Sequence, residues 1–241
     1  MEQINLIFLL LALLAEIIGT IGGFGSSVFF VPVGNFYFDF HSVLGLTALF
    51  HLSSNLSKLF LFKKGIDKKI ILQLGIPAVI FVVIGGWATQ YLDPNILQGI
   101  LGIFLVGFSL LFLLKKQLVF QAKAQNALLG GSVSGFSAGL LGTGGAIRGL
   151  TMAAFNLEKS VFIATSALID LLIDASRTLV YWNNGYIHQH DLIYVPFLIV
   201  IGLVGSWMGK KVLVFIPQTY FRKISLLLIL IIGLITLGAW I

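Results

Sequence analysis

Five glycines and one arginine interrupt a long apolar stretch of the chain, at Gly139-Leu-Leu-Gly-Thr-Gly-Gly-Ala-Ile-Arg-Gly149. Glycine has no Cβ atom and holds a helix weakly. We therefore expect residues 126–155 to enter as one helix, unwind at Gly142 to Gly145 and restart as a second helix. A broken backbone at membrane depth is tolerated only where protein or a water-filled cavity surrounds it. The break is a candidate binding site.

Composition places this break in a membrane. The 241 residues are 58% hydrophobic and 10% charged, with a mean hydropathy of +1.04, whereas a soluble domain carries about 25% charged residues. The chain is predicted to be an all-α polytopic membrane protein that contacts the lipid bilayer. Its apolar segments are 4–34, 42–62, 69–90, 95–114, 126–155, 160–182, 192–214 and 218–241.

The remaining composition narrows the function further. The net charge of +6 lies almost entirely in short loops, so it predicts membrane topology and no nucleic-acid binding. The absence of cysteine excludes disulfides and thiol catalysis. We expect no cofactor and no metal, and we interpret His188, His190 and Asp191 as part of a solvated loop. An intramembrane enzyme lacks a credible nucleophile and base, so the chain is predicted not to be an enzyme.

A second glycine break, Gly19-Thr-Ile-Gly-Gly-Phe-Gly-Ser-Ser27, lies about 120 residues earlier. The same shift pairs Gly25 with Gly145 and Trp87 with Trp207. We interpret the chain as an internal duplication with a first repeat at 1–114, a cytoplasmic basic linker at 115–125 and a second repeat at 126–241.

Basic loops indicate how the two repeats are oriented. Loop 63–69 is rich in lysine, whereas its counterpart at 182–190 has no Lys or Arg, and the next loop is basic only in the second repeat, at 210–223. If basic loops are cytoplasmic, the repeats are inverted and each has an odd number of crossings. We predict that each repeat is a glycine-broken re-entrant hairpin, at 4–34 or 126–155, followed by three transmembrane helices. Eight full crossings in parallel repeats remain the alternative.

Ionisable residues form one polar stripe in each repeat. Such residues are costly in lipid and usually face a cavity or a partner. Asp170, Asp174 and Arg177 share one face of segment 160–182, with Asp174 and Arg177 alternatively forming a structural ion pair. The matching positions of segment 42–62 are His51, Asn55 and Lys58. In the inverted arrangement we expect the two stripes to face each other across the break region. We expect Lys58 to reach cytoplasmic water and assign no role to Glu16, whose counterpart is Phe136.

The half-helix that restarts after each break directs free N–H groups and the positive end of its dipole inward, which favours an anion. Ser26, Ser27 or Thr143 could cap it, and Arg148 suits an oxyanion. The predicted substrate-binding residues are Gly23, Gly25, Ser26, Ser27, Asn55, Thr143, Gly144, Gly145, Arg148, Ser166 and Arg177, and the predicted proton-coupling residues are His51, Asp170 and Asp174. The glycines could alternatively serve only close helix packing.

The two breaks resemble those of the TauE/SafE sulfite exporter family, also called the toluene-sulfonate uptake permease family. The resemblance rests on Gly19-Thr-Ile-Gly-Gly-Phe-Gly-Ser-Ser-Val-Phe-Phe-Val-Pro32 and Gly139-Leu-Leu-Gly-Thr-Gly-Gly-Ala-Ile-Arg148, each followed by a segment with a small polar pair near its start, here Thr165-Ser166. It covers essentially the whole chain. It implies transport of small sulfur-containing anions, such as sulfite, sulfoacetate or other organosulfonates, in the bacterial inner membrane.

These features together predict a secondary transporter, an exporter of such anions that is coupled to protons. An uncoupled anion channel and an uptake permease for another small organic anion are the alternatives. The expected partners are the small anionic substrate and the lipid bilayer. A homo-oligomer is compatible with the sequence, which fixes neither the exact substrate nor the direction of transport.

Overall fold

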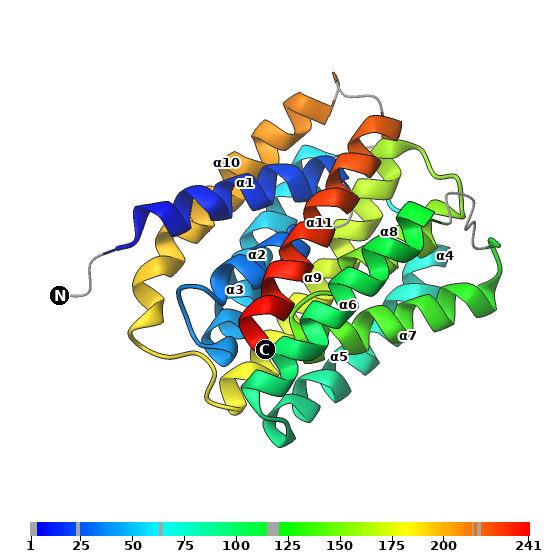
Figure 1. Cartoon of the computed structure of the whole chain (residues 1–241). Helices are drawn as coiled ribbons and strands as arrows, with labels where there is room; N and C mark the ends of the chain where they lie inside the picture. Colours follow the sequence, from blue (N-terminus) through cyan, green and yellow to red (C-terminus); the bar gives the residue numbers. More distant parts are fainter. Residues whose placement is uncertain (1–3, 23–24, 63–64, 115–120, 214, 216–217) are drawn as a thin grey trace.

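The architecture is that of a computed structural model, which describes residues 4–22, 25–62, 65–114, 121–213, 215 and 218–241, with the backbone alone for 218–225. Every regular element in these residues is helical, which confirms the predicted all-α class. The long helices run roughly alongside one another in a single bundle (Figure 1).

The first half of the chain contains α1 (Leu6–Gly22), α2 (Ser27–Gly34), α3 (Phe40–Leu61), α4 (Lys68–Ile70), the π-turn η1 (Ile71–Gly75), α5 (Ile76–Ala88), η2 (Thr89–Tyr91) and α6 (Pro94–Leu114). The second half contains α7 (Ala124–Leu141), α8 (Gly145–Ala153), α9 (Lys159–Asn183), η3 (Asp191–Tyr194), α10 (Val195–Leu213) and α11 (Gln218–Trp240). These bounds follow the predicted apolar segments closely, and the chain leaves its helix at both glycine breaks.

Three helical stretches in the described residues are long and apolar enough to cross a membrane: Lys68–Tyr91, Pro94–Leu114 and Asp191–Leu213. Helices α3 and α9 are of similar length, with 22 and 25 residues, but they carry the polar stripes and are less apolar. The chain is therefore a membrane-embedded protein whose two most polar long helices lie inside the bundle.

The predicted segment 69–90 is interrupted by a π-turn that the sequence analysis did not anticipate. Pro77 lies at the start of α5 and has no N–H to donate to the carbonyl of Gln73, four residues earlier. The π-turn Ile71–Gly75 occurs at this point, where a regular α-helical bond is missing. The segment still continues as one helical stretch from Lys68 to Tyr91.

The two halves interlock rather than lying side by side as separate bodies. Helix α5 packs along α7, α1 along α10, α6 along α11 and α3 against α9, and each of these pairs joins one half to the other. The shift of about 120 residues makes α7, α9, α10 and α11 the counterparts of α1, α3, α5 and α6. Replacing each helix by its counterpart turns the pair α5–α7 into α10–α1 and leaves the pairs α3–α9 and α6–α11 unchanged. The neighbouring positions of α1, α10 and α11 are visible in Figure 1.

Basic residues gather at one end of the bundle, the end where α3 stops and α9 starts. Two bonds join the segments there, because Lys210 Nζ donates to the Leu61 carbonyl at 2.7 Å and the Asp67 N–H donates to Thr165 Oγ1 at 2.9 Å. We call this the basic end. Its described lysines are Lys68, Lys69, Lys123, Lys159, Lys210 and Lys211.

The opposite end has the reverse composition. The Asn5 N–H donates to Tyr194 Oη at 3.2 Å, and Thr89 Oγ1 lies 3.0 Å from Tyr186 Oη, so the start of α1 and the loops after α5 and α9 meet there. We call this the acidic end. The described loops 35–39, 89–95 and 184–194 contain three aspartates and no lysine or arginine.

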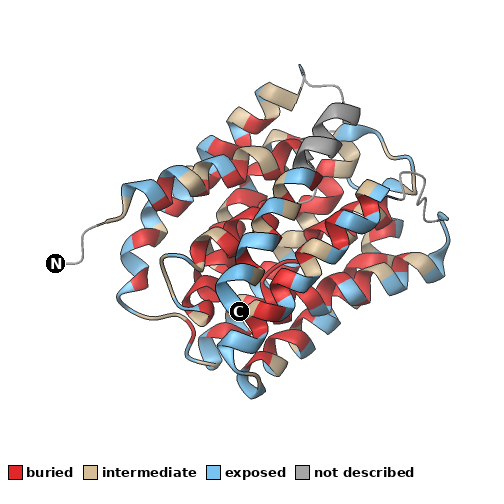
Figure 2. Ribbon diagram, viewed as in Figure 1, coloured by how far each residue is buried: buried red, intermediate tan, exposed pale blue. Residues whose placement is uncertain are grey.

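Burial is arranged as expected for a protein in lipid. Many large apolar side chains on the outer helix faces are exposed, while the buried set includes Glu16, His51, Lys58, Arg148 and Arg177. Figure 2 shows buried positions lining the inner helix faces and exposed positions lining the outer ones. Burial of an unpaired charge is costly, so each of these groups requires a partner inside the bundle.

A ladder of glycines brings α7 directly onto the backbone of α5. A Cβ atom added at Gly131, Gly135 or Gly139 would lie 2.1 to 2.2 Å from the carbonyl oxygens of Leu74, Ala78 and Val82, respectively. Spacing of four residues places the three glycines on one face of the helix. Close packing, one alternative for the glycine cluster, therefore accounts for Gly135 and Gly139, whereas Gly142 and Gly144 belong to the break.

This ladder predicts a large difference between two Gly→Ala substitutions. Gly135→Ala is expected to lower the free energy of unfolding by about 1–3 kcal/mol, because the new methyl group meets a backbone oxygen that cannot move aside. Gly107→Ala in α6 is the matched control, since nothing lies within 4 Å of its added Cβ. Thermal unfolding in detergent would compare them, and equal melting temperatures would contradict the ladder.

Candidate functional site

The two helix breaks meet in the interior of the bundle. Gly25 and Gly142 adopt left-handed backbone conformations, with φ of 80° and 72°, which glycine tolerates and other residues rarely adopt. A Cβ on Gly25 would lie 3.7 Å from the Cα of Gly145, and Ser27 Oγ donates to Thr143 Oγ1 at 3.3 Å. Of the predicted break residues, Gly23 lies outside the described residues.

Ser26, Ser27 and Thr143 are the alternatives for a cap or donor at the helices that restart after the breaks. Ser26 is the N-cap of α2 and Gly144 that of α8, and neither position makes a side-chain cap. The Ser26 hydroxyl donates to Glu16 at 2.6 Å instead, and that of Ser27 donates to Thr143. The first turns of α2 and α8 therefore direct their backbone N–H groups inward without competition from a cap.

Arg148 is held by a single carboxylate. Its guanidinium forms a two-pronged ion pair with Asp170, NH1 to Oδ1 and NH2 to Oδ2, while Nε donates to Ser166 Oγ at 3.2 Å. The Arg148 side chain is 1% exposed and that of Asp170 is 19% exposed. A Cβ on Gly25 would lie 3.9 Å from Arg148 NH2, so the first break adjoins the guanidinium. This geometry is the one that a guanidinium offers to an oxyanion.

A small cavity of about 20 Å³, large enough for a molecule the size of water and lined by both polar and apolar residues, reaches Asp170 of this ion pair. Phe162 and Ile163, near the start of α9, line it, so the cavity lies toward the basic end. It brings together four of the predicted site residues, because its lining also includes Gly25, Asn55, Ser166 and Asp170.

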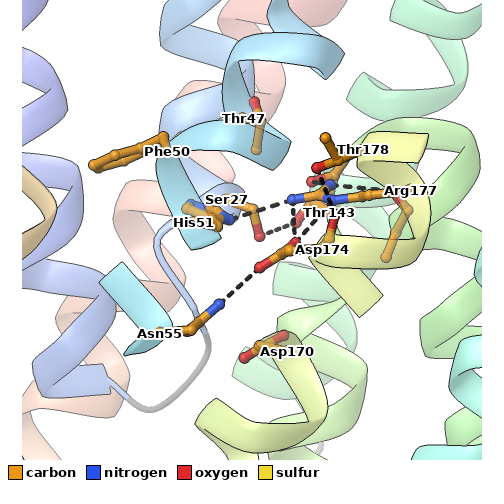
Figure 3. A network of polar contacts seen from close by, with 12 residues as sticks. Ser27, Thr47, Phe50, His51, Asn55, Thr143, Asp170, Asp174, Arg177 and Thr178 are labelled. Carbon is orange, nitrogen blue, oxygen red and sulfur yellow. Dashed lines mark hydrogen bonds and ion pairs between the residues drawn. The ribbon is translucent and has the colours of Figure 1, made fainter. Parts of the chain in front are cut away.

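Arg177 has no hydrogen-bond donor to spare. Nε and NH2 lie 2.8 and 2.7 Å from Asp174 Oδ1, NH1 donates to the carbonyls of Gly142 and Ala138 at 2.8 and 3.3 Å, and NH2 lies 3.3 Å from His51 Nδ1. A guanidinium has five N–H groups, and these contacts use all five. Figure 3 shows Arg177 between His51 and Asp174, with Asp170 set apart from them. The alternative reading of Asp174 and Arg177 as an ion pair is confirmed.

Hydrogen bonding also fixes the form of His51. Arg177 can only donate, so His51 Nδ1 accepts from it. The Ser26 hydroxyl donates to Glu16, so it accepts from His51 Nε2 at 2.9 Å. His51 is thereby assigned as the neutral imidazole protonated on Nε2. The two polar stripes face each other as predicted, because Asn55 also donates to Asp174 Oδ2 at 2.7 Å.

Glu16, to which the sequence assigned no role, is fully buried at the centre of a second polar cluster. Its carboxylate pairs with Lys58 Nζ at 2.9 Å, so the expectation that Lys58 reaches cytoplasmic water is wrong. It also accepts hydrogen bonds from the hydroxyls of Thr20, Ser26, Ser54 and Ser206. The cost of an acid inside an apolar segment was the available signal, since it demands a cation partner nearby.

Comparison with protein-family models provides the remaining observation. The model of the sulfite exporter TauE/SafE matches residues 8–236 of the 241. The chain belongs to the TauE/SafE sulfite exporter family. Searches of curated proteins and of solved structures found no match. Membership makes this chain a membrane transporter of the sulfite or anion exporter type, in a family of transporters rather than enzymes.

Proposed function

We propose that this TauE/SafE chain exports a small sulfur-containing anion, such as sulfite, sulfoacetate or another organosulfonate, which binds Arg148 in place of the Asp170 carboxylate. One observation carries the proposal: Arg148 already holds an oxyanion in two-pronged geometry, and the carboxylate that supplies it, Asp170, lines a small cavity. A sulfite or sulfonate group presents oxygens with similar spacing and charge, so it can take the same two N–H groups.

The surroundings of Arg148 supply the rest of an anion site. The N-termini of α2 and α8 contribute the positive ends of two helix dipoles. The backbone of Gly25 allows close approach, and Ser166 and Asn55 offer polar contacts at the cavity. Among the predicted ligands, Ser27, Thr143, Gly144 and Gly145 would contribute backbone or hydroxyl groups at the junction of the breaks.

Exchange between Asp170 and the substrate links anion binding to a proton. Arg148 cannot satisfy two carboxylate-like anions in one fork, so Asp170 leaves when the substrate binds. An anionic Asp170 released inside the bundle is costly, and uptake of a proton removes that cost. The anion and one proton then move together, so export is driven by the outward gradient of the anion and carries a proton out with it. Asp174 and His51 are already fully engaged with Arg177, Asn55 and Ser26, so in this scheme they position the site.

The distribution of charge supports the proposed topology. With the basic end in the cytoplasm, α1–α2 and α7–α8 are re-entrant hairpins from opposite faces, and three helices cross in each of two inverted repeats, 1–114 and 126–241. The helix pairs that interchange between the halves agree with such a relation. The bacterial inner membrane is the proposed location, with the anion and the bilayer as partners.

Transport in proteoliposomes tests the coupling. We expect an inward pH gradient to drive sulfite or sulfoacetate against its own gradient in the wild type. Asp170→Asn is expected to transport the anion only down its gradient, because an amide cannot carry the proton. Asp93→Asn, at an exposed carboxylate of the acidic end, is the matched control and should behave as the wild type.

Two results would favour the alternative functions, an uncoupled channel or an uptake permease. Anion flux in the wild type that ignores the pH gradient and is unchanged in Asp170→Asn indicates an uncoupled channel. Flux of carboxylates but of no sulfur oxyanion indicates an uptake permease for another organic anion, and it leaves the role of Arg148 intact.

A further inference from the structure

A cluster of two histidines and an aspartate lies at the acidic end, away from the proposed anion site. His188, His190 and Asp191 follow α9 and lead into η3, and one potential ligand atom from each lies within 4.8 Å of the others. The sequence analysis treats these residues as a solvated loop. That expectation holds for the two half-exposed imidazoles but is wrong for Asp191, whose side chain is only 4% exposed.

Asp191 is the unusual member of the cluster. Neither of its carboxylate oxygens has a hydrogen-bond partner among the described residues. Burying a carboxylate without donors costs free energy, and such groups generally either pair with a cation or coordinate a metal. The two oxygens point toward the histidines, because Oδ2 lies 3.4 Å from His188 Nδ1 and Oδ1 lies 3.2 Å from His190 Nε2.

These separations are close to those between metal ligands. In a tetrahedral zinc site with bonds of about 2.0–2.2 Å, neighbouring donor atoms lie about 3.3–3.6 Å apart. The three candidate donor atoms lie within 4.8 Å of one another, so the side chains draw together slightly around the ion. Neutral imidazole nitrogens and a carboxylate oxygen are donors that suit Zn²⁺ and other divalent transition metals. The exposure of His188 and His190 leaves an aqueous route to the cluster and room for a water ligand.

We propose that His188, His190 and Asp191 form a binding site for a divalent transition metal, with Zn²⁺ as the representative ion. The Ser42 hydroxyl, at the start of α3, lies 2.8 Å from His188 Nδ1 and orients that ring. It rotates aside or stays in the outer shell when the metal binds.

Calorimetric titration of the purified, tag-free and chelator-treated protein with ZnCl₂ tests the site. We expect one Zn²⁺ per chain in the wild type and a Kd weaker by about tenfold or more in His190→Ala and in Asp191→Asn. His190→Ala alters a half-exposed side chain and is the variant least expected to disturb folding. Asp93→Asn, at the same end, should bind as the wild type does.

A thermal-shift series gives an independent readout. At one fixed Zn²⁺ concentration, the metal should raise the melting temperature of the wild type and of Asp93→Asn equally, and that of His190→Ala by less. Absence of saturable Zn²⁺ binding in the wild type would overturn the proposal, as would wild-type affinity in both His190→Ala and Asp191→Asn. In that case the cluster is an ordinary set of contacts between Asp191 and the two histidines. The outcome does not depend on anion transport, so it can fail while the proposed function stands.

Discussion

Protein carrying Arg148→Ala is expected to lose the thermal stabilisation that a sulfur oxyanion gives to the wild type. A ligand that binds only the folded state raises the melting temperature, and sulfite, thiosulfate, sulfoacetate, taurine and sulfate are the compounds to compare. Truncating one partner of a buried charge pair costs about 2–5 kcal/mol, which is a loss of about 30-fold or more in affinity. A ligand shift of the same size in Arg148→Ala would remove Arg148 from the site.

Arg148→Ala alone leaves the Asp170 carboxylate without its cation, so the fold itself is affected. The double variant Arg148→Ala/Asp170→Asn removes that charge and should recover stability without recovering the ligand shift. The single variant Asp170→Asn frees the guanidinium and should bind the anion at least as tightly as the wild type. Loss of binding in Asp170→Asn would contradict competition between Asp170 and the substrate.

Arg177→Ala is expected to produce the largest loss of stability of any single substitution discussed. It removes contacts to two carbonyls at the end of α7 and leaves Asp174 buried without its ion pair. Breaking a buried pair in this way costs about 3–5 kcal/mol. Lys123→Ala, an exposed cation just before α7, is the control and should change stability little.

Unfolding in a detergent of fixed composition would measure the effect of Arg177→Ala. A loss of less than about 1 kcal/mol would contradict the internal role assigned to Arg177. Arg177→Lys is informative as well, because one ammonium cannot reach Asp174, His51 and two carbonyls together. We expect it to be almost as unstable as Arg177→Ala.

The helical segments and the two glycine breaks could be predicted from the sequence, because they depend on residues that are close together in the chain. Apolar length gave the helical segments, and glycine spacing gave the breaks at Gly25 and Gly142, since both depend on backbone conformation within a few residues. Spacing of four and seven residues along one face also predicted that the stripes of α3 and α9 meet, as the bond between Asn55 and Asp174 confirms.

Partner choice across the fold could not be predicted in the same way. Glu16 draws its contacts from α2, α3 and α10, and Ser206 is 190 residues away in the sequence. Nothing near Glu16 in the chain identifies Lys58 as its cation, because Lys58 stands close to basic loop residues that favour a reading as a surface lysine. The commitment of Arg177 to α7 carbonyls likewise depends on where α7 ends relative to α9.

The contact of α7 with α5 and the contact of α1 with α10 differ in the groups that touch. Glycines of α7 rest on backbone carbonyls of α5, whereas Gly205 and Gly209 of α10 rest on the side chains of Glu16 and Thr20 in α1. The backbone of α7 can pack on that of α5 in only one position, because neither backbone can adjust its shape. The Glu16 carboxylate between α1 and α10 is surrounded by hydroxyl groups and can exchange one hydrogen-bond donor for another. The two contacts therefore differ in how readily they rearrange. In a transporter that opens alternately to the two sides of the membrane, two contacts that resist rearrangement unequally would give the open states different free energies without any substrate.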